Sequence, residues 1–200
     1  MRGVLTLILA ASLGLCSSIA LGGDFQKGWA AYNSLDYAGA KAEWQDLADA
    51  GDADAAYGMG MLYGNGFGVD MNDELALKYY GIAAEQGHAD AAFNLAVMHQ
   101  NGWGVAQSDE IANQWYLIAA EKGNTEAQMA LGRYYAMDFL DTYDPVQAYK
   151  WFSLAEKLGD FDAGEKRAFI ASRMTAEQVS EADALVDSWA DAHRSMFAHD

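Results

Sequence analysis

A repeat of 36 residues is the feature of this sequence that most limits what the chain can fold into. The stretch "GNGFGV" at residues 64–69 recurs as "QNGWGV" at residues 100–105, and the flanking sequence aligns at the same period without a gap. Periods of roughly 20 to 50 residues are typical of arrays in which each unit packs on its neighbours. The alignment divides the chain into a partial repeat at 24–54 and full repeats at 55–90, 91–126 and 127–162.

Within each unit, recurring residue types mark where helices begin and end. Asp, Asn and Ser share one column, and these residues cap a helix start by accepting a hydrogen bond from a free amide. A glycine follows fifteen residues later, where a chain can leave a helix in the left-handed conformation. Apolar residues between them fall at helical spacing. The columns hold Asp36, Asn72, Ser108 and Asp144 at the start and Gly51, Gly87, Gly123 and Gly159 at the end.

The glycine-rich stretch itself resembles a phosphate-binding loop, but its surroundings argue against that interpretation. No strand pattern precedes it, no lysine follows it, and the chain has a net charge of −17, whereas phosphate loops need these features and a favourable potential. Its glycines suit a turn between two helices, because glycine adopts backbone angles that other residues resist. We expect Phe67 and Trp103 to fold back from these turns into the repeat core.

Each unit is therefore predicted to be two antiparallel helices. Small residues in the first helix, Gly60, Ala96 and Gly132, permit close approach of the second helix. Residues 163–200 carry a capping box, "TAEQ" at 175–178, followed by one apolar stripe, as a terminal helix that closes a stack requires. The predicted fold is an all-α, right-handed α-solenoid of antiparallel helix pairs, with about three and a half repeats plus a C-terminal capping helix.

The stretches "YGNGFGVDMNDELALKYYGIAAEQG" and "HQNGWGVAQSDEIANQWYLIAAEKG" resemble the Sel-one-like repeat, a branch of the tetratricopeptide superfamily, and the resemblance covers about residues 25–162. The resemblance implies an adaptor for protein complexes, and exported bacterial members act in signalling, envelope processes or host contact. A cysteine-rich branch has been linked to penicillin binding and β-lactam hydrolysis, but this chain lacks those cysteines. The third unit, with "AMDFLDTYD", departs from the pattern by losing both turn glycines, and His99 replaces the usual tyrosine.

Residues 1–23 are predicted to be a signal peptide, with cleavage after about residue 20–22. Arg2 precedes an apolar run, and the triplet at 18–20 fits the small-x-small cleavage rule. An uncleaved membrane anchor and a lipid on Cys16 are the alternatives. The expected location is therefore the periplasm or the medium. No disulfide is expected, because Cys16 is the only cysteine.

Outside this segment the chain is strongly acidic. It has 12 Lys and Arg against 29 Asp and Glu, and Arg2 is the one charged residue among the first 23. Such a surface repels nucleic acid and anionic membranes. We therefore expect no nucleic-acid partner and no membrane insertion after signal removal.

No catalytic residue, cofactor or metal site is predicted. His88 follows a helix-ending glycine and is expected in solvent, whereas His99 lies in a core column. His193 and His199 are six residues apart, so one helical face does not present both to a zinc ion. The acidic stretch at 70–74 lacks the alternation and central glycine of a calcium loop.

The predicted function is an exported scaffold that binds a protein or peptide partner in its concave groove, and a cell-wall or β-lactam-directed hydrolase is the alternative. The first helices of such solenoids line the concave side. Residues spaced by four along them form a partly apolar stripe, which a purely solvated face would not need, and asparagines at its edge suit a peptide backbone. Packing of the stripe on a neighbouring helix is the competing interpretation. The candidate partner-binding residues are Tyr57, Met61, Asn65, Phe93, Val97, Asn101, Met129 and Arg133, with Met137 ending the stripe.

Overall fold

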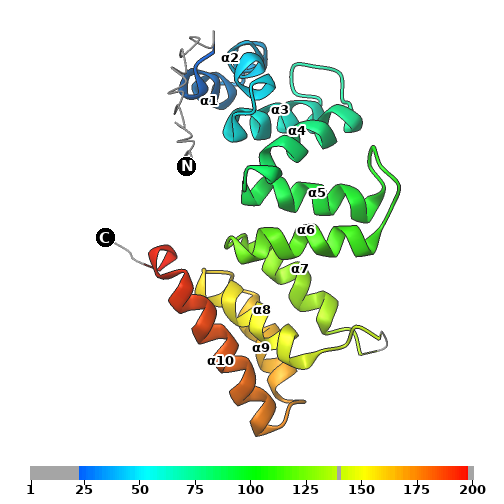
Figure 1. Cartoon of the computed structure of the whole chain (residues 1–200), viewed down its shortest axis with the longest axis vertical. Coiled ribbons are helices and arrows are strands. Elements are labelled where there is room, and N and C mark those ends of the chain that lie inside the picture. The colour runs from blue at the N-terminus through cyan, green and yellow to red at the C-terminus, as the bar shows by residue number, and fades with distance from the viewer. Residues whose placement is uncertain (1–22, 139–140, 198–200) are drawn as a thin grey trace, which may run out of the picture.

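The computed structural model describes residues 23–138 and 141–197, and this part of the chain is entirely helical (Figure 1). It contains ten α-helices, one short 3₁₀-helix and no strand, which confirms the all-α prediction. The signal segment up to residue 22, with Cys16, lies outside the described residues, as does His199. No helix in the described ranges is long and apolar enough to cross a membrane. The elements are α1 (Phe25–Asn33), α2 (Tyr37–Asp49), α3 (Ala53–Asn65), α4 (Asp73–Glu85), α5 (Ala89–Asn101), α6 (Asp109–Glu121), α7 (Thr125–Tyr135), α8 (Pro145–Lys157), α9 (Ala163–Ala171), α10 (Ala176–Ala192) and η1 (Arg194–Met196).

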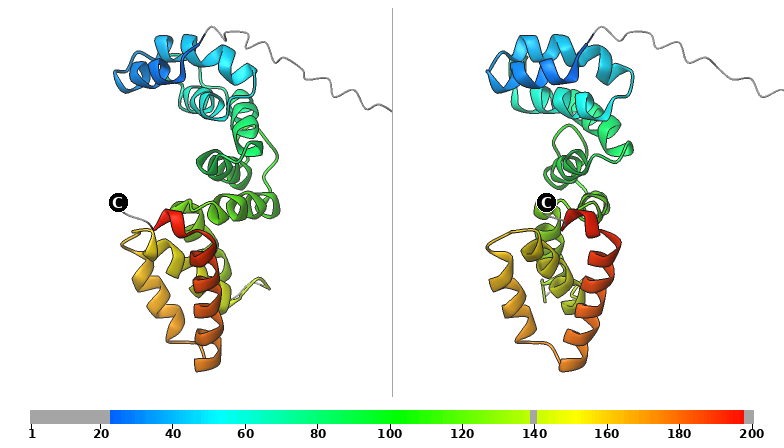
Figure 2. Two further views of the ribbon diagram at one scale, coloured as in Figure 1. Left: turned by 60° about the vertical axis from the view of Figure 1, so that its left-hand side comes forward. Right: turned by 90° about the vertical axis from the view of Figure 1, so that its left-hand side faces the viewer.

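From α1 to α8 the helices pack in pairs along one curved row (Figures 1 and 2). α3 packs on α4, α5 on α6 and α7 on α8, and the second helix of each pair also packs on the first helix of the next. Contacts between helices further apart are few. This nearest-neighbour arrangement is that of a solenoid, so the predicted fold is confirmed. The segment at 24–54, predicted as a partial repeat, holds the complete pair of α1 and α2.

The predicted helix caps are present, because side-chain oxygens accept hydrogen bonds from backbone amides of the first turn. A second set of caps, which the sequence analysis did not single out, begins the first helices of the pairs one residue after the glycines. The predicted caps are Asp36, Asn72, Ser108 and Asp144, and the additional caps are Asp52, His88 and Asn124.

His88 is one of these caps, so the prediction that it lies in solvent is wrong. Its Nδ1 accepts a hydrogen bond from the amide of Ala91 at 3.3 Å. Its ring stacks on Tyr57 at a centroid distance of 4.3 Å, and its side chain is only 18% exposed. The histidine therefore fills the cap position that Asp52 and Asn124 occupy in the neighbouring repeats.

The glycines mark backbone positions that other residues resist, as predicted. The glycines that follow the second helices have φ between 85° and 100° at Gly51, Gly87, Gly123 and Gly159. Gly66 in the first helix–helix turn has φ of 69° and ends α3 in the left-handed conformation. These angles belong to the region in which a Cβ atom is unfavourable, so the glycines are required by the turns and not by a phosphate.

Small residues let the two helices of a pair approach closely, which confirms the prediction made for Gly60, Ala96 and Gly132. A Cβ atom on Gly60 would lie 2.5 Å from the ring of Tyr80, and one on Gly132 would lie 2.5 Å from the ring of Phe152. Ala96 occupies the same column in the middle pair and is fully buried. The core of each pair is thus an aromatic ring of the second helix against the bare backbone of the first.

The two turn aromatics behave differently, and the prediction is right for only one of them. Phe67 stacks on Tyr37 at 4.8 Å and packs against the core. Trp103, its equivalent 36 residues later, is 51% exposed. The residue equivalent to Tyr37 is there Asp73, so Trp103 has no aromatic ring to stack on and stays at the surface.

The C-terminal segment holds two helices, and they do not repeat the earlier pairs. Ala163 of α9 is fully buried, as are the equivalent alanines of α3, α5 and α7. The next core position, which holds Met59, Leu95 and Leu131 in those helices, holds Arg167 in α9. Arg167 forms an ion pair with Glu156 of α8 at 2.7 Å. α10 packs on α8, and α9 and α10 diverge (Figure 2).

Candidate partner-binding groove

Three cavities open between successive helix pairs, and the 36-residue repeat relates them to one another. Each lies between the first helix of one pair, its second helix and the first helix of the next pair. The α3–α5 pocket has a volume of about 300 Å³, the α5–α7 pocket about 270 Å³, and the α7–α9 pocket about 670 Å³. They follow one another along the first helices, and this row of pockets is referred to as the groove; the α5–α7 and α7–α9 pockets share Arg133 and Met137.

The α3–α5 pocket contains four of the predicted residues. Tyr57, Met61 and Asn65 line it from α3, and Val97 lines it from α5. Tyr57 is half-buried between His88 and Tyr80. Burial raises the pKa of Tyr57 above its ordinary value, so its hydroxyl stays protonated and can donate a hydrogen bond at neutral pH.

Phe93 and Met129 occupy the column of Tyr57 in the next two repeats, and the side chain at this position is more deeply buried in the third repeat than in the second. Phe93 is half-buried and its ring lies 5.8 Å from that of Tyr116. Met129 is only 5% exposed and belongs to the core around Phe152. The prediction of Met129 as a partner contact is therefore wrong, because α8 and α9 cover its side chain from the C-terminal side.

The two asparagines at the edge of the groove are exposed, but each has a partner within its own helix. The side-chain amide of Asn65 donates to the carbonyl of Met61 at 2.9 Å. That of Asn101 donates to the carbonyl of Val97 at 2.8 Å. Asn65 lines the α3–α5 pocket, whereas Asn101 lines none of the three pockets. Each amide keeps its oxygen and a second N–H for a partner.

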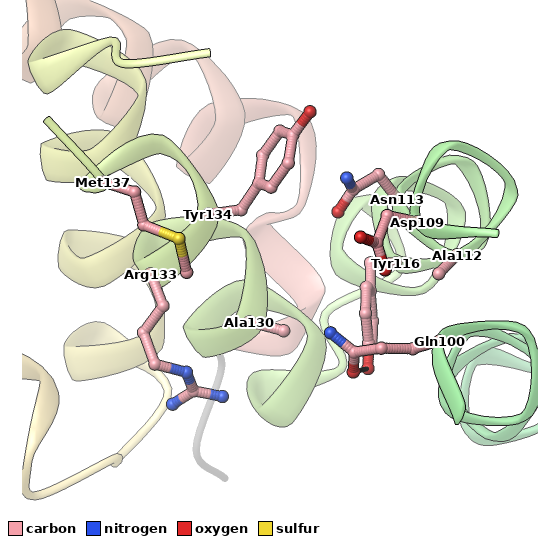
Figure 3. Close-up of a pocket in the computed structure, with 9 residues that line it drawn as sticks. All are labelled: Gln100, Asp109, Ala112, Asn113, Tyr116, Ala130, Arg133, Tyr134 and Met137. Carbon is pink, nitrogen blue, oxygen red and sulfur yellow. Dashed lines mark hydrogen bonds between the residues drawn. The ribbon is translucent and has the colours of Figure 1, made fainter. Parts of the chain in front are cut away.

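The α5–α7 pocket is drawn in Figure 3, where α7 faces α5 and α6 across the opening. Arg133 reaches it from α7 and Met137 from just beyond the end of that helix, and both also line the α7–α9 pocket. Tyr116 at its floor donates a hydrogen bond to Gln100 at 2.8 Å, and burial raises the pKa of Tyr116. Arg133 is exposed, so a partner in either pocket meets a guanidinium group.

The contribution of α9 and of the residues just after it was not predicted from the sequence. Lys166, Phe169 and Arg173 line the α7–α9 pocket, and Phe169 and Arg173 are the equivalents of Arg133 and Met137. The signal was available: Ala163 continues the column of buried alanines, so the repeat register runs past residue 162. The position of Trp103 in the lining of the α3–α5 pocket was not predicted either.

The charge of the groove changes along the array. Asp73 lines the α3–α5 pocket and Asp109 the α5–α7 pocket, each at the first residue of a second helix. The equivalent residue of the third pair is Pro145. The α7–α9 pocket instead holds three basic side chains beside Asp138 and Glu165. The groove thus passes from an acidic end to a basic end.

The composition of the pocket linings resembles that of protein-binding surfaces. Aromatic rings and Met occur in all three linings, and Arg in two of them, and these residue types are enriched at the centres of protein interfaces. The α3–α5 and α5–α7 pockets each have one carboxylate in their lining, and the α7–α9 pocket has two, Asp138 and Glu165. Among the described residues there is no group of three or more His, Cys, Asp or Glu side chains that could hold a metal ion.

Comparison with known proteins agrees with this architecture. The model of the Sel1 repeat matches residues 53–88, 89–124 and 125–160. Its units therefore begin with α3, α5 and α7, two residues before the predicted repeats at 55–90, 91–126 and 127–162. Curated protein sequences gave no match. A Sel1 repeat protein from Oxalobacter formigenes has a similar structure, with 33% identity and a TM-score of 0.58 over 62% of this chain and 94% of that one.

A second similar structure is that of c5321, a protective antigen present in uropathogenic Escherichia coli strains that displays an SLR fold. It is 25% identical, with a TM-score of 0.51, and the match covers 86% of this chain. This chain spans only 46% of that protein's length. The three matched repeats make up more than half of the 200 residues, and the chain therefore belongs to the Sel1 repeat family, whose members are generally non-catalytic scaffolds for protein–protein interaction.

Proposed function

We propose that this protein is an exported scaffold that holds a protein or peptide partner in the groove formed by the α3–α5, α5–α7 and α7–α9 pockets. The observation that carries the proposal is the periodic set of three pockets along one row of helices. Periodic pockets suit an extended segment or a helix, because such a segment presents side chains at regular intervals. The partial exposure of Met61, Val97 and Arg133 in the groove supports the same proposal.

Photo-crosslinking in the native cell tests the groove. A photoreactive amino acid replaces Val97, which lines the α3–α5 pocket, and a matched control replaces Gln114, which is exposed on α6 and lines none of the three pockets. The proposal expects a discrete crosslinked protein at position 97 that is absent at position 114. Capture of the same proteins at both positions, or at neither, would count against a groove partner.

Substitutions then test the energetics of the captured complex. Arg133→Ala removes an exposed side chain that lines two pockets, so it should weaken binding without changing the helical content. The expected loss is about 1 to 2 kcal/mol, the range in which exposed interface contacts begin to matter. Lys78→Ala is the control, because Lys78 is exposed on α4 and lines none of the three pockets.

The export component of the proposal rests on the N-terminal sequence alone. Arg2, the apolar run and the small residues at 18–20 are the motivation. N-terminal sequencing of the protein from its native source should begin near Leu21 or Gly23. An intact Met1 in a membrane fraction would contradict cleavage and favour an anchored form.

A further inference from the structure

The α7–α9 pocket combines a basic rim with an apolar floor. Arg133, Lys166 and Arg173 line it, and Phe152 and Ile170 form buried parts of its wall. Phe169 at its edge is 61% exposed. Arg173 already pairs with Asp138 at 2.9 Å. In a chain with a net charge of −17, such a place suits an apolar side chain that is flanked by carboxylates.

The chain itself presents a segment with this chemistry. Asp160, Phe161 and Asp162 form the turn between α8 and α9, and Phe161 is 99% exposed. The turn is ordered, because the carboxylate of Asp160 accepts hydrogen bonds from the amides of Asp162 and Ala163, both at 2.9 Å. The equivalent residues in the earlier repeats are Ala53, Ala89 and Thr125, so the repeat does not require an aromatic ring there.

Glu165 and Phe169 are exposed on α9, one helical turn apart. Along the axis of this helix, Phe161 precedes it in the turn and Arg173 follows its C-terminal end. At about 1.5 Å per residue, Phe161 lies roughly 12 Å from Phe169 along this axis. The ring therefore does not occupy the pocket of its own chain, whose lining does not include it.

Among the described residues α10 packs mainly on α8, which leaves one side of α9 exposed. Ala168 is exposed, although its equivalents Gly60, Ala96 and Gly132 are buried beneath the second helix of their pairs. Ala168 lies about 100° from Phe169 around the helix. A small residue at that place allows a second helix to approach closely.

We propose that the α7–α9 pocket receives Phe161 from a second copy of this chain. Two α9 helices that pair antiparallel about Arg167 place Phe161 of each copy opposite Arg173 of the other, and Glu165 opposite Phe169. Asp160 and Asp162 then face the basic rim of the other copy. The contact is self-complementary and two-fold symmetric, so each copy supplies one aromatic residue and one pocket. It does not depend on a groove partner, and a partner that reached the α7–α9 pocket would compete with it.

Sedimentation equilibrium of the purified protein over a concentration series tests the pairing. A reversible dimer is expected, weakened by added salt because charged groups face one another. Phe161→Asp should weaken the dimer by about 10-fold or more, because the buried aromatic side chain is lost and a carboxylate cannot replace it against the apolar floor of the pocket. Met71→Asp is the matched control: Met71 is 68% exposed in the turn between α3 and α4, and the dimer constant should not change.

A mixing experiment identifies the two surfaces. Phe169→Asp disrupts the pocket and leaves the aromatic segment, whereas Phe161→Asp does the reverse. Each variant alone should self-associate at least about 10-fold more weakly than the wild type, but their mixture retains one intact contact of the two and should form a heterodimer that is tighter than either homodimer. A wild-type protein that is monomeric at every concentration, an equal effect of Met71→Asp, or a mixture that stays monomeric would overturn the proposal. Crosslinking at position 97 reports on the groove partner separately.

Discussion

The regular pairs from α3 to α8 and the terminal helices α9 and α10 share one register but differ in how the second helix packs. In α3, α5 and α7 the central core position is Met59, Leu95 or Leu131, and the second helix of the pair covers it. In α9 that position is Arg167, which reaches to Glu156. α10 packs on α8 instead. We infer that the residue type at this one core position helps to determine whether the following helix covers the first helix or leaves it exposed.

The largest effect on stability is expected when the arginine found in α9 is placed at the equivalent position of a regular pair. Leu131 is 1% exposed, so Leu131→Arg places a charge in the core and should lower the free energy of unfolding by about 4 kcal/mol or more. Urea unfolding followed by circular dichroism measures the loss. Arg167→Leu is the reverse exchange and should change stability by no more than about 1 kcal/mol, since it removes a half-exposed ion pair. Equal losses at both positions would show that the column is not what separates the two regions.

The close approach of the helices in a regular pair predicts an intermediate effect. A Cβ atom on Gly132 would lie 2.5 Å from the ring of Phe152, so Gly132→Ala should destabilise by about 1 to 3 kcal/mol through overpacking. Ala168→Ser, at the exposed equivalent position in α9, should change stability by less than about 0.5 kcal/mol. Thermal unfolding of both variants provides the comparison. A tolerated Gly132→Ala would mean that Phe152 can shift to admit the added methyl group.

The smallest expected difference concerns the caps of the first helices. Asn124 is 8% exposed, accepts from the amide of Ala127 at 2.8 Å and donates to Asp90 at 2.8 Å. Asn124→Ala should therefore lower the free energy of unfolding by about 1 to 2 kcal/mol. Asp160 takes the same column before α9, but its turn has less packed around it, and Asp160→Ala should lose about 0.5 kcal/mol. Chemical denaturation of the pair separates them, and a larger loss at Asp160 would contradict the ranking.

The parts of the fold that could be predicted are those that depend on residues close together in the sequence. The cap at Asp144 and the left-handed glycine at Gly159 depend on a few local backbone groups, so their residue types reveal them. The packing role of Gly60 could be predicted because a small residue recurs at its position in each repeat, and an aromatic residue recurs at a fixed position in the second helix. The register, the turns and the row of first helices followed from these signals.

The parts that could not be predicted depend on which repeat lies next in space. Met129 lies in the stripe of Tyr57 but is covered by the helices that follow it. Trp103 lies in the column of Phe67, and Asp73 of the preceding pair leaves it exposed. The α7–α9 pocket depends on α9 following the register while α10 leaves it. A periodic pattern predicts the average unit, whereas these residues depend on differences between units.

The nearest-neighbour packing of the array has a mechanical consequence for anything bound along it. The interfaces of α4 with α5 and of α6 with α7 act like hinges in series, because few contacts bridge more distant helices. Small rotations at each interface add along the row, so the span from the first pocket to the last is softer than the width of any one pocket. A short ligand in one pocket therefore leaves the bend of the molecule free. A long ligand that contacts all three pockets restricts these rotations and so fixes the curvature of the helix array.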